Sequence, residues 1–500
     1  MDDVTDFKNY IGGKWVDARG GDVIERANPA TGAMIGSFPK SGREDVAAAV
    51  EAASAAFDSW RRYPAPKRGE ILYRVGQIMA ERKEQLGREM TEEMGKVLTE
   101  AKGDVQEGID MAFYMGGEGR RMFGQTVPAE LPNKWAMSVR KPLGVVAAIT
   151  PWNFPMAIPT WKIMPALVAG NTVVLKPASY TPRMAVRLVE IFEEAGLPKG
   201  ALNLVIGSGQ DAGEVLLRHP DVALISFTGS NETGTHINVE AAKSLKRVSL
   251  ELGGKNAIIV MDDADIDLAV EGIVWSAFGT SGQRCTAASR VIADRTVADE
   301  VTQKIADRAE AMRLGDGLEA STDVGPIVSK SQLERVQSYV MIGQEEGAEL
   351  AVGGRIADWD DLSKGHFHQP TVFGNVKPDM RIAQEEIFGP VTAVIPVDGL
   401  EQAIDVANNV KYGLSASIYT QDVNRAFLAM QELYTGICYI NAGTIGAEIQ
   451  LPFGGTKATG NGHREAGQAA LDVVTEWQAI YVDYSGRLQR AQIDEAPSVG

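Results

Sequence analysis

The chain has 500 residues, of which 44% are hydrophobic and 23% charged, and it carries a formal net charge of −17. A single domain usually holds roughly 100–200 residues, so this length predicts two or three domains. The acidic balance argues against nucleic acid and anionic membranes as partners, because both attract basic surfaces.

The N-terminus and the cysteine content favour a cytoplasmic protein. The segment MDDVTDFKNYIGGKW lacks the basic region and the apolar stretch of a secretory signal. The most apolar region, 143–175, is interrupted by one lysine, two asparagines and four prolines, so we expect buried core there and no membrane span. Only Cys285 and Cys438 are present, which makes a disulfide framework unexpected and a reducing cytoplasm the default.

Short β-branched runs alternate with helical patterns along the chain. Strands are expected at 144–150, 171–177, 201–207 and 223–229. Helices are expected between them, up to residue 168, at 184–196, where Gly196 and Pro198 form a stop, and around 213–219. This alternation predicts a parallel sheet covered on both faces. A second alternating stretch runs from about residue 256 to about 442.

Cys285 lies in the segment GTSGQRCTAASR, where small residues would let the backbone come close to a ligand. A lone cysteine is usually a small core residue, and Cys438 in GICYIN fits that interpretation. The polar, glycine-rich neighbours of Cys285 instead favour a reactive thiol. Such a nucleophile needs a thiolate, donors for an oxyanion, and a base if water is to release the intermediate.

Asn153 and Glu251 are candidates for the donor and the base. Asn153 lies between prolines and aromatic residues in TPWNFP, where its amide either meets an oxyanion or caps a turn. Glu251 lies between two leucines at a strand end in SLELGGK, and two glycines follow and leave room. Its carboxylate is either paired with a lysine or free to act as a general base.

Together these segments resemble the aldehyde dehydrogenase superfamily. The similarity covers nearly the whole chain, from YIGGKWV at 10–16 to about residue 484. Cys285 follows Glu251 by 34 positions, and the motifs, weak one by one, are specific in this order. They are TPWNFP, LKPAS, FTGS, LELGGKN, GQRCTA, EEIFGPV and LPFGGTKATGNG.

The resemblance implies an α/β fold with a Rossmann-like cofactor domain, an α/β catalytic domain and a small β oligomerisation arm. The expected bounds are 1–121 and 143–253 for the cofactor-binding domain, 254–458 for the catalytic domain, 122–142 and 472–486 for the arm, and 487–500 for a C-terminal tail. The arm implies a homodimer or homotetramer. The tail either lacks structure or packs across a neighbouring subunit, and the faintly amphipathic LQRAQI favours partial order.

The resemblance also assigns roles position by position. Cys285 is the expected nucleophile, Asn153 and the Cys285 backbone N–H the oxyanion hole, and Glu251 the base that activates water. The residues expected to bind the cofactor, NADP or NAD, are Trp152, Lys176, Ser179, Gly207, Gly229, Ser230, Glu386 and Phe388. Those expected to line the pocket for a small-molecule aldehyde are Phe154, Trp161, Arg284, Thr286 and Phe453. No metal is expected.

Three places bear on specificity. Ser179 stands where many NAD-preferring relatives have a glutamate that would repel a 2′-phosphate, so we expect NADP to be accepted beside Lys176, with NAD also used. IGSGQDAG at 206–213 departs from the G-x-G-x-x-G fingerprint and fits either the family's atypical cofactor binding or a tight turn. Arg284 either binds an anionic group of the aldehyde or points away and pairs with an acidic neighbour.

The expected reaction is oxidation of an aldehyde to a carboxylic acid through a cysteine thiohemiacetal and a thioester. The substrate is either a semialdehyde with an anionic group or any of a broad range of aliphatic and aromatic aldehydes. A CoA-dependent acylating relative would usually lack the glutamate at 251, and a non-catalytic binding protein would be expected to lose Glu251 or Cys285. A cysteine hydrolase would need a histidine, and none of the five lies in a motif with Cys285.

Overall fold

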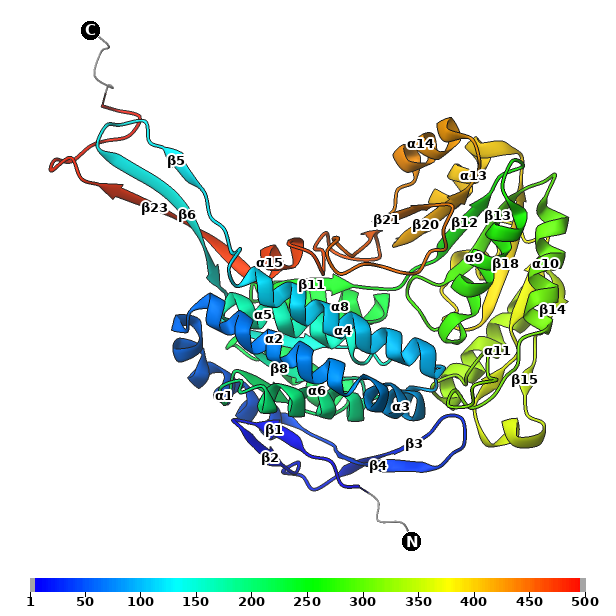
Figure 1. The fold of residues 1–500 in the computed structure, drawn as a ribbon, viewed down its shortest axis with the longest axis horizontal. Coiled ribbons are helices and arrows are strands. Elements are labelled where there is room, and N and C mark those ends of the chain that lie inside the picture. Colours follow the sequence, from blue (N-terminus) through cyan, green and yellow to red (C-terminus); the bar gives the residue numbers. More distant parts are fainter. Residues whose placement is uncertain (1–4, 495–500) are drawn as a thin grey trace.

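A computed structural model describes residues 5–494 of the chain. Two seven-stranded sheets form the centres of the molecule, and a long three-stranded arm extends from one side (Figure 1). Helices cover both faces of each large sheet, which confirms the expected α/β fold class. No helix among residues 5–494 is long and apolar enough to cross a membrane.

The first sheet has five parallel strands and two antiparallel ones at one edge. In spatial order the strands are β11 (Arg247–Glu251), β10 (Val222–Thr228), β7 (Val145–Ile149), β8 (Thr172–Lys176), β9 (Leu202–Leu204), β1 (Asn9–Ile11) and β2 (Lys14–Val16). The four expected strands therefore form. The strand β9 is shorter than expected, because the side chain of Asn9 accepts the N–H of Ile206 at 2.9 Å and takes it out of the ladder.

Side chains of β7 alternate between two apolar clusters, as the period of a strand requires. Val146 and Ala148 face the helices of one layer, and Val145 and Ala147 face those of the other. The first layer comprises α2 (Ala65–Glu81), α3 (Lys83–Met94), α4 (Leu98–Glu118), α5 (Ala157–Ala169) and α6 (Pro182–Glu194). The second comprises α1 (Arg43–Arg62), α7 (Glu214–Arg218) and α8 (Asn231–Ala242).

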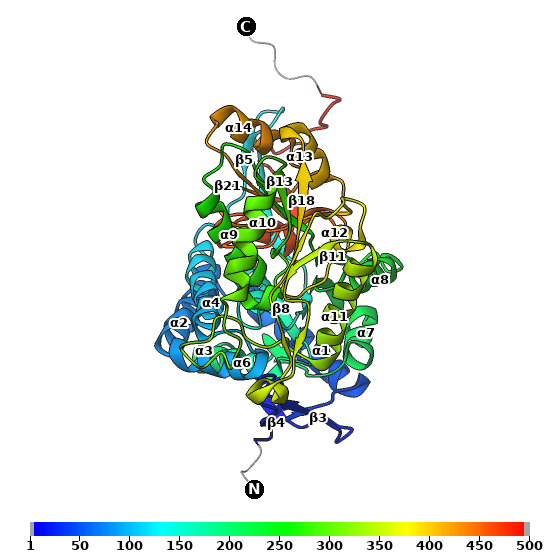
Figure 2. The same ribbon diagram turned by 90° about the vertical axis from the view of Figure 1, so that its right-hand side faces the viewer.

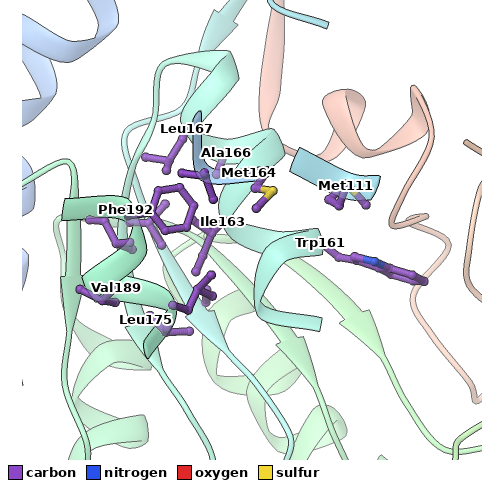
Figure 3. Close-up of a cluster of buried hydrophobic side chains, with 14 of the residues drawn as sticks. Met111, Trp161, Ile163, Met164, Ala166, Leu167, Leu175, Val189 and Phe192 are labelled. Atoms are coloured by element: carbon purple, nitrogen blue, oxygen red, sulfur yellow. The ribbon is translucent and has the colours of Figure 1, made fainter. Parts of the chain in front are cut away.

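Helix α5 is buried on all sides between the sheet and the other helices of its layer. Its residues Ile163 and Leu167 pack with Phe192 of α6 in the cluster of Figure 3. Trp161 extends from the same helix away from the centre of that cluster, toward the opposite side of the view. The helix thus anchors the first domain at one end and presents an aromatic side chain at the other.

The second sheet is parallel except for its edge strand β14. Its strands are, in spatial order, β14 (Glu349–Val352), β17 (Thr371–Gly374), β18 (Val391–Val397), β13 (Ala288–Asp294), β12 (Asn256–Val260), β20 (Ser415–Tyr419) and β21 (Ile437–Ile440). One face packs against α9 (Ile266–Phe278) and α10 (Ala298–Glu310). The other packs against α11 (Lys330–Glu345), α12 (Arg381–Gln384), α13 (Gly399–Asn408) and α14 (Val423–Glu432) (Figure 2).

The arm is an antiparallel sheet in which β6 (Lys134–Pro142) lies between β5 (Thr126–Pro128) and β23 (Thr475–Asp483). It projects well beyond the body of the molecule (Figure 1). The tail continues along it: Gln489 is buried and donates a hydrogen bond to the Pro132 carbonyl at 2.8 Å. The rest of the predicted tail, 495–500, lies outside the described residues.

Between β21 and the arm, the chain returns from the second sheet to the first. Leu252 donates to the Thr459 carbonyl at 2.7 Å, and the side chain of Asn461 donates to the Val248 carbonyl at 2.7 Å. We call residues 441–468 the return segment; α15 (Ala469–Val473) follows it. Three two-stranded ladders complete the fold: β3 (Val23–Ala27) with β4 (Met34–Pro39), β15 (Ile356–Ala357) with β16 (Phe367–His368), and β19 (Tyr412–Gly413) with β22 (Thr456–Lys457).

Candidate active site

The loop before Cys285 has an unusual backbone. Thr280, Ser281 and Gly282 have φ values of 54°, 56° and 68°, in the left-handed region that costs energy for residues other than glycine. A Cβ on Gly282 would collide with the carbonyl of Gly389, so only glycine fits there. The small residues of GTSG thus allow a tight approach to the neighbouring chain.

Side chains from other segments hold this loop. The Glu100 carboxylate accepts hydrogen bonds from the N–H of Thr280 at 2.8 Å and from its hydroxyl at 3.1 Å. Ser281 donates through its hydroxyl to the Gly325 carbonyl at 2.7 Å. These bonds compensate the strain of the left-handed residues and fix the position from which Cys285 is presented.

Cys285 lies between two cavities. It lines one of ≈ 190 Å³ together with Asn153, Glu386 and Phe388. It also lines a second of ≈ 60 Å³, together with Glu251 and several aromatic residues. The thiol can therefore be reached from both sides. Cys438, by contrast, is exposed on β21, where the sequence favoured a core position.

The thiol of Cys285 is neutral at rest. Burial and the nearby carboxylates of Glu386 and Glu251 raise its pKa to about 12, against which the backbone N–H groups of Cys285 and Thr286 act only partly. A thiolate must therefore form with help from a neighbouring group or from a cationic ligand.

Asn153 is buried and lines the same cavity as Cys285. Its side-chain N–H donates to the Gln283 carbonyl at 3.0 Å, in the loop that carries the cysteine, and so it does not cap a local turn. Gln283 is itself fixed, because its side-chain oxygen accepts the Val328 N–H at 3.0 Å. The amide nitrogen has two hydrogens, so the second remains available for an oxyanion.

Glu251, at the end of β11, is a buried carboxylate without a partner. It is 3% exposed, and neither of its oxygens makes a hydrogen bond within the part of the chain that the structure describes. Burial and then the charge of Glu465 raise its pKa well above the ordinary value, although Lys162 and Arg464 oppose this. A carboxylate in this state binds a proton readily, as a general base must.

Lys162 and Glu465 form a buried ion pair behind Glu251. The ammonium contacts the Glu465 carboxylate and donates to the Ser226 hydroxyl at 3.2 Å. Lys162 is therefore not the partner of Glu251. The pair was not predicted from the sequence, although Lys162 itself was a signal, because a lysine in the apolar helix α5 requires a counterion.

A third cavity, of ≈ 430 Å³, adjoins that of Cys285 and shares Trp152 and Gly229 with it. Lys176 and Ser179 line it. Lys176 is buried, donates to the Pro177 carbonyl at 2.9 Å and has a pKa lowered to about 8 by burial. Its ammonium makes no ion pair with any carboxylate of residues 5–494, so donors remain free toward the cavity.

Gly207 does not line this cavity. A Cβ there would lie 2.8 Å from the Ser41 carbonyl, and the Gly207 carbonyl accepts the Ser179 hydroxyl at 3.3 Å, so the glycine lies behind the wall. Gly209 and Gly213 line the cavity instead, at the two ends of a single wide helical turn. The spacing of the glycines did not show which of them faces the ligand.

Gly229 and Ser230 lie at the start of α8. Ser230 caps the helix, since its hydroxyl accepts the Thr233 N–H at 3.3 Å. The free N–H groups and the dipole of a helix start favour an anion. Both residues line the cavity that also contains Cys285.

Glu386 and Phe388 form the wall opposite. Phe388 has a φ of 60° and meets the edge of Trp152 at 5.3 Å between ring centres. Glu386 accepts the Gly254 N–H at 3.0 Å through one oxygen, and a side chain at Gly253 would collide with the other. Lysine and helix N–H groups for phosphates, a carboxylate for ribose hydroxyls and aromatic rings for a base or nicotinamide all fit a dinucleotide.

All five residues expected in the aldehyde pocket line the ≈ 60 Å³ cavity: Phe154, Trp161, Arg284, Thr286 and Phe453. The rings of Trp161 and Phe453 meet edge to face with centres 5.0 Å apart. Phe453 reaches the cavity from the return segment. The pocket also contains Glu107, Gly446 and Ala447, which the sequence analysis did not single out.

Arg284 lines the pocket and also lies against an acidic neighbour, so both interpretations of this residue stay open. It lines the pocket, with its guanidinium between the rings of Phe154 and Trp275 at 5.4 and 5.2 Å. It also donates to the Thr280 hydroxyl at 2.9 Å and lies 3.4 Å from a Glu100 oxygen. These contacts use one edge of the guanidinium and leave other N–H groups for a ligand.

A thiol between a groove suited to a dinucleotide and an aromatic pocket fits an oxidoreductase that uses a cysteine nucleophile. The chain belongs to the aldehyde dehydrogenase family, whose sequence model matches residues 15–480. It is an enzyme that oxidises the aldehyde group with NAD(P) as cofactor. The predicted family and reaction class are thereby confirmed.

Three relatives illustrate the similarity. The α-ketoglutaric semialdehyde dehydrogenase of Bacillus subtilis is 43% identical over 95% of this chain and 98% of its own length. The phenylacetaldehyde dehydrogenase of Pseudomonas fluorescens is 42% identical over 95% of both chains. The crystal structure of betaine aldehyde dehydrogenase from Staphylococcus aureus in complex with NAD+ superposes with a TM-score of 0.95 at 36% identity, covering 98% of this chain and 97% of that one.

We predict that iodoacetamide alkylates Cys285 slowly at neutral pH in a Cys438→Ala background without cofactor. Because the pKa of the thiol lies near 12, the thiolate fraction, and with it the rate, rises about tenfold per pH unit from pH 7 to 9. Glu386→Gln removes a negative charge that raises this pKa, so it speeds alkylation at fixed pH.

Mass spectrometry of the labelled peptide gives the rate, and the variant lacking both cysteines gives the background. A rate that levels off below pH 8 would show that the thiol ionises far more easily than its surroundings imply.

Proposed function

We propose that Cys285 attacks the aldehyde, that Asn153 and the Cys285 N–H bind the resulting oxyanion, and that Glu251 activates the water that releases the acid. The observation that carries this proposal is the buried, unpartnered carboxylate of Glu251 beside the same small cavity as the thiol. A buried carboxylate without a partner does not stabilise the fold, so its presence beside the thiol supports a role as a base near the acyl group.

Each residue has a separate task in this scheme. The thiol of Cys285 releases its proton to solvent as its sulfur bonds to the aldehyde carbon, and the oxyanion of the resulting thiohemiacetal accepts hydrogen bonds in the oxyanion hole. When bound, NAD(P) supplies the acceptor for the hydride, held by Lys176 and Glu386. The thioester left on Cys285 then meets water deprotonated by Glu251. Behind Glu251, the charge of Glu465 favours uptake of this proton by raising the pKa of the carboxyl group, whereas Lys162 opposes it.

Two variants test these roles separately. Glu251→Gln keeps the volume but cannot accept a proton, so it forms about one equivalent of reduced cofactor per site and then stalls at the thioester. Asn153→Ala removes one oxyanion donor and lowers the first turnover itself, by about 10²–10³. Rapid-mixing absorbance at 340 nm, together with intact-protein mass, distinguishes a stalled acyl-enzyme from a slow attack.

Thermal unfolding of both variants provides the control, because Asn153→Ala also leaves the Gln283 carbonyl without its partner. A Glu251→Gln enzyme that turns over steadily near the parent rate would contradict the proposed base. Unchanged turnover in a folded Asn153→Ala enzyme would contradict the oxyanion role.

The physiological aldehyde, we propose, is a semialdehyde that carries a carboxylate at its far end. Arg284 supports this, since it lines the pocket and retains donors for a planar anion. Relatives named as α-ketoglutaric and malonate semialdehyde dehydrogenases, 43% and 41% identical, support it too. Broad specificity is the second candidate, favoured by the aromatic pocket wall and by the phenylacetaldehyde dehydrogenase among the relatives.

For the cofactor, we propose that NADP is accepted as well as NAD. The ammonium of Lys176 meets the cavity without a carboxylate partner, and the Ser179 hydroxyl beside it places no negative charge against a 2′-phosphate. The NAD+ complexes of structural relatives support use of NAD by this chain as well.

A panel of aldehydes measured with both cofactors tests the two specificities. We expect kcat/KM to be at least about tenfold higher for a semialdehyde acid than for the uncharged aldehyde of equal length, since charged hydrogen bonds are worth about 1.5–3 kcal/mol. Arg284→Met should reduce this ratio. We expect NADP and NAD to differ by less than about a hundredfold, and Ser179→Glu to disfavour NADP.

Phenylacetaldehyde serves as the uncharged aromatic control. Equal kcat/KM for acid and uncharged aldehyde would establish broad specificity instead. NAD better than NADP by more than a hundredfold would contradict the role of Ser179.

We propose that the chain forms a homodimer or homotetramer through the arm. Within residues 5–494 the outer edge of β23 has no pairing strand, and the arm exposes Trp135, Trp477 and Tyr481, which are 54%, 48% and 68% accessible. Such an edge and such aromatic rings are usually covered. Light scattering should give a multiple of the 53.7 kDa chain mass, and a monomer at micromolar concentration would contradict the proposal.

The cytoplasm remains our proposed location, supported by two free cysteines and by the acidic net charge. Immunodetection in fractionated cells would locate the protein, and its recovery from an oxidising compartment would contradict this proposal.

A further inference from the structure

Glu107 is a carboxyl group in the aldehyde pocket for which the proposed mechanism has no use. It lies on α4 and lines the cavity together with Arg284 and Cys285. Among residues 5–494 its carboxyl group makes no hydrogen bond or ion pair with another side chain. A carboxyl group placed beside the reacting thiol, without a protein partner, is available to a ligand.

The charges around Glu107 favour its neutral form. The nearby ammonium of Lys96 is already paired with Asp104 at 2.9 Å, and Arg284 lies against Glu100. Asp104 and Asp110 on the same helix add negative charge. Burial first, and then Asp104, raise the pKa of Glu107 to about 8, against the opposing effect of Arg284 and Lys96.

Two further titratable groups, Tyr439 and Glu448, lie near Glu107 without lining the pocket. The phenol of Tyr439, on β21, has a pKa raised to about 12 by burial and by the charges of Glu107, Glu448 and Cys285. Tyr439 therefore keeps its proton at physiological pH, and Glu448 is exposed. Of the groups at the far end of the pocket, Glu107 is the one whose charge changes near pH 8.

A neutral carboxyl group donates one hydrogen bond, and Arg284 presents its remaining N–H groups in the same cavity. An anion alone would use the guanidinium and leave the O–H of Glu107 without an acceptor. A ligand that binds both Arg284 and Glu107 has a carboxylate and, next to it, an oxygen that accepts a hydrogen bond. The 2-oxo acid group has this arrangement, whereas a simple ω-aldehyde acid offers a methylene at that position.

We infer that Glu107 is a specificity-determining residue, which donates a hydrogen bond to the 2-oxo oxygen of a semialdehyde whose adjacent carboxylate binds Arg284. The inference rests on the proposed anionic substrate and names its class: ω-aldehydes of 2-oxo acids. The same role of Glu107 predicts that KM for this substrate rises with pH. Below pH 8 Glu107 is protonated and donates; above pH 8 it becomes an anion, loses the donor and repels the substrate carboxylate, so KM rises.

The test uses three aldehydes of equal chain length: 2,5-dioxopentanoate, 5-oxopentanoate and pentanal. At pH 7 the parent enzyme should favour 2,5-dioxopentanoate over 5-oxopentanoate by about threefold to tenfold in kcat/KM, as one hydrogen bond provides. Glu107→Gln retains an N–H donor, so this ratio persists, but the rise of KM between pH 7 and 9 disappears. Glu107→Leu has no donor, and the ratio falls to about one.

Different results would contradict the role of Glu107 and the proposed anionic substrate. If the parent enzyme does not favour 5-oxopentanoate over pentanal, the anionic substrate itself is wrong. If it does, but Glu107→Leu leaves the ratio of the two acids unchanged, Glu107 has no role in selecting the 2-oxo group. A preference for the cationic betaine aldehyde that grows above pH 8 and disappears in Glu107→Gln would show that the residue binds as an anion, which also overturns the inference.

Discussion

The carboxylate of Glu100 is the contact on which the geometry of the site depends. It binds the backbone and hydroxyl of Thr280, in a loop whose left-handed residues would not hold that conformation unsupported. Glu100 belongs to α4, in the layer that covers the first sheet, while the loop leads into the second. Together with the hydrogen bonds of Ser281 and Gln283, this side chain sets where the nucleophile lies relative to the cofactor groove, and it also lies against Arg284 in the aldehyde pocket.

The electrostatics of the site follow from carboxyl groups held in a small buried volume. Glu251, Glu386 and Glu107 all have raised pKa values, in each case with burial as the largest cause. Burial and the charges of Glu386 and Glu251 keep the thiol of Cys285 protonated. A resting site of this kind protects Cys285 from adventitious electrophiles, because the neutral thiol is a poor nucleophile. The three carboxyl groups differ in their position: Glu386 lines the cofactor side of the thiol, whereas Glu251 and Glu107 line the aldehyde pocket.

Much of this site could be predicted because short segments of the sequence indicate the strands and the functional residues next to them. Alternating apolar runs indicated the strands of the first sheet, and ordered motifs indicated Cys285, Glu251 and the aromatic pocket. Contacts between distant segments could not be predicted: Lys162 meets Glu465 across 303 positions. The prediction of Gly207 as a cofactor-binding residue was inaccurate for a different reason. Spacing identifies a turn, but which glycine faces the cavity depends on neighbours such as Ser41, which lies far away in the sequence.

The return segment explains how one scaffold can keep its chemistry while its substrate changes. Gly446, Ala447, Phe453 and Glu465 enter the pocket from this segment, whereas the dinucleotide groove is lined by loops of the first sheet and, on the opposite wall, by Glu386 and Phe388. The pocket residues on α4 and on the return segment line a different cavity from Lys176 and Ser179. Substitutions there can alter the far end of the aldehyde without moving the groove or the loop of Cys285. Selection of the substrate and binding of the cofactor are therefore separable, and the thiol is the point where they meet.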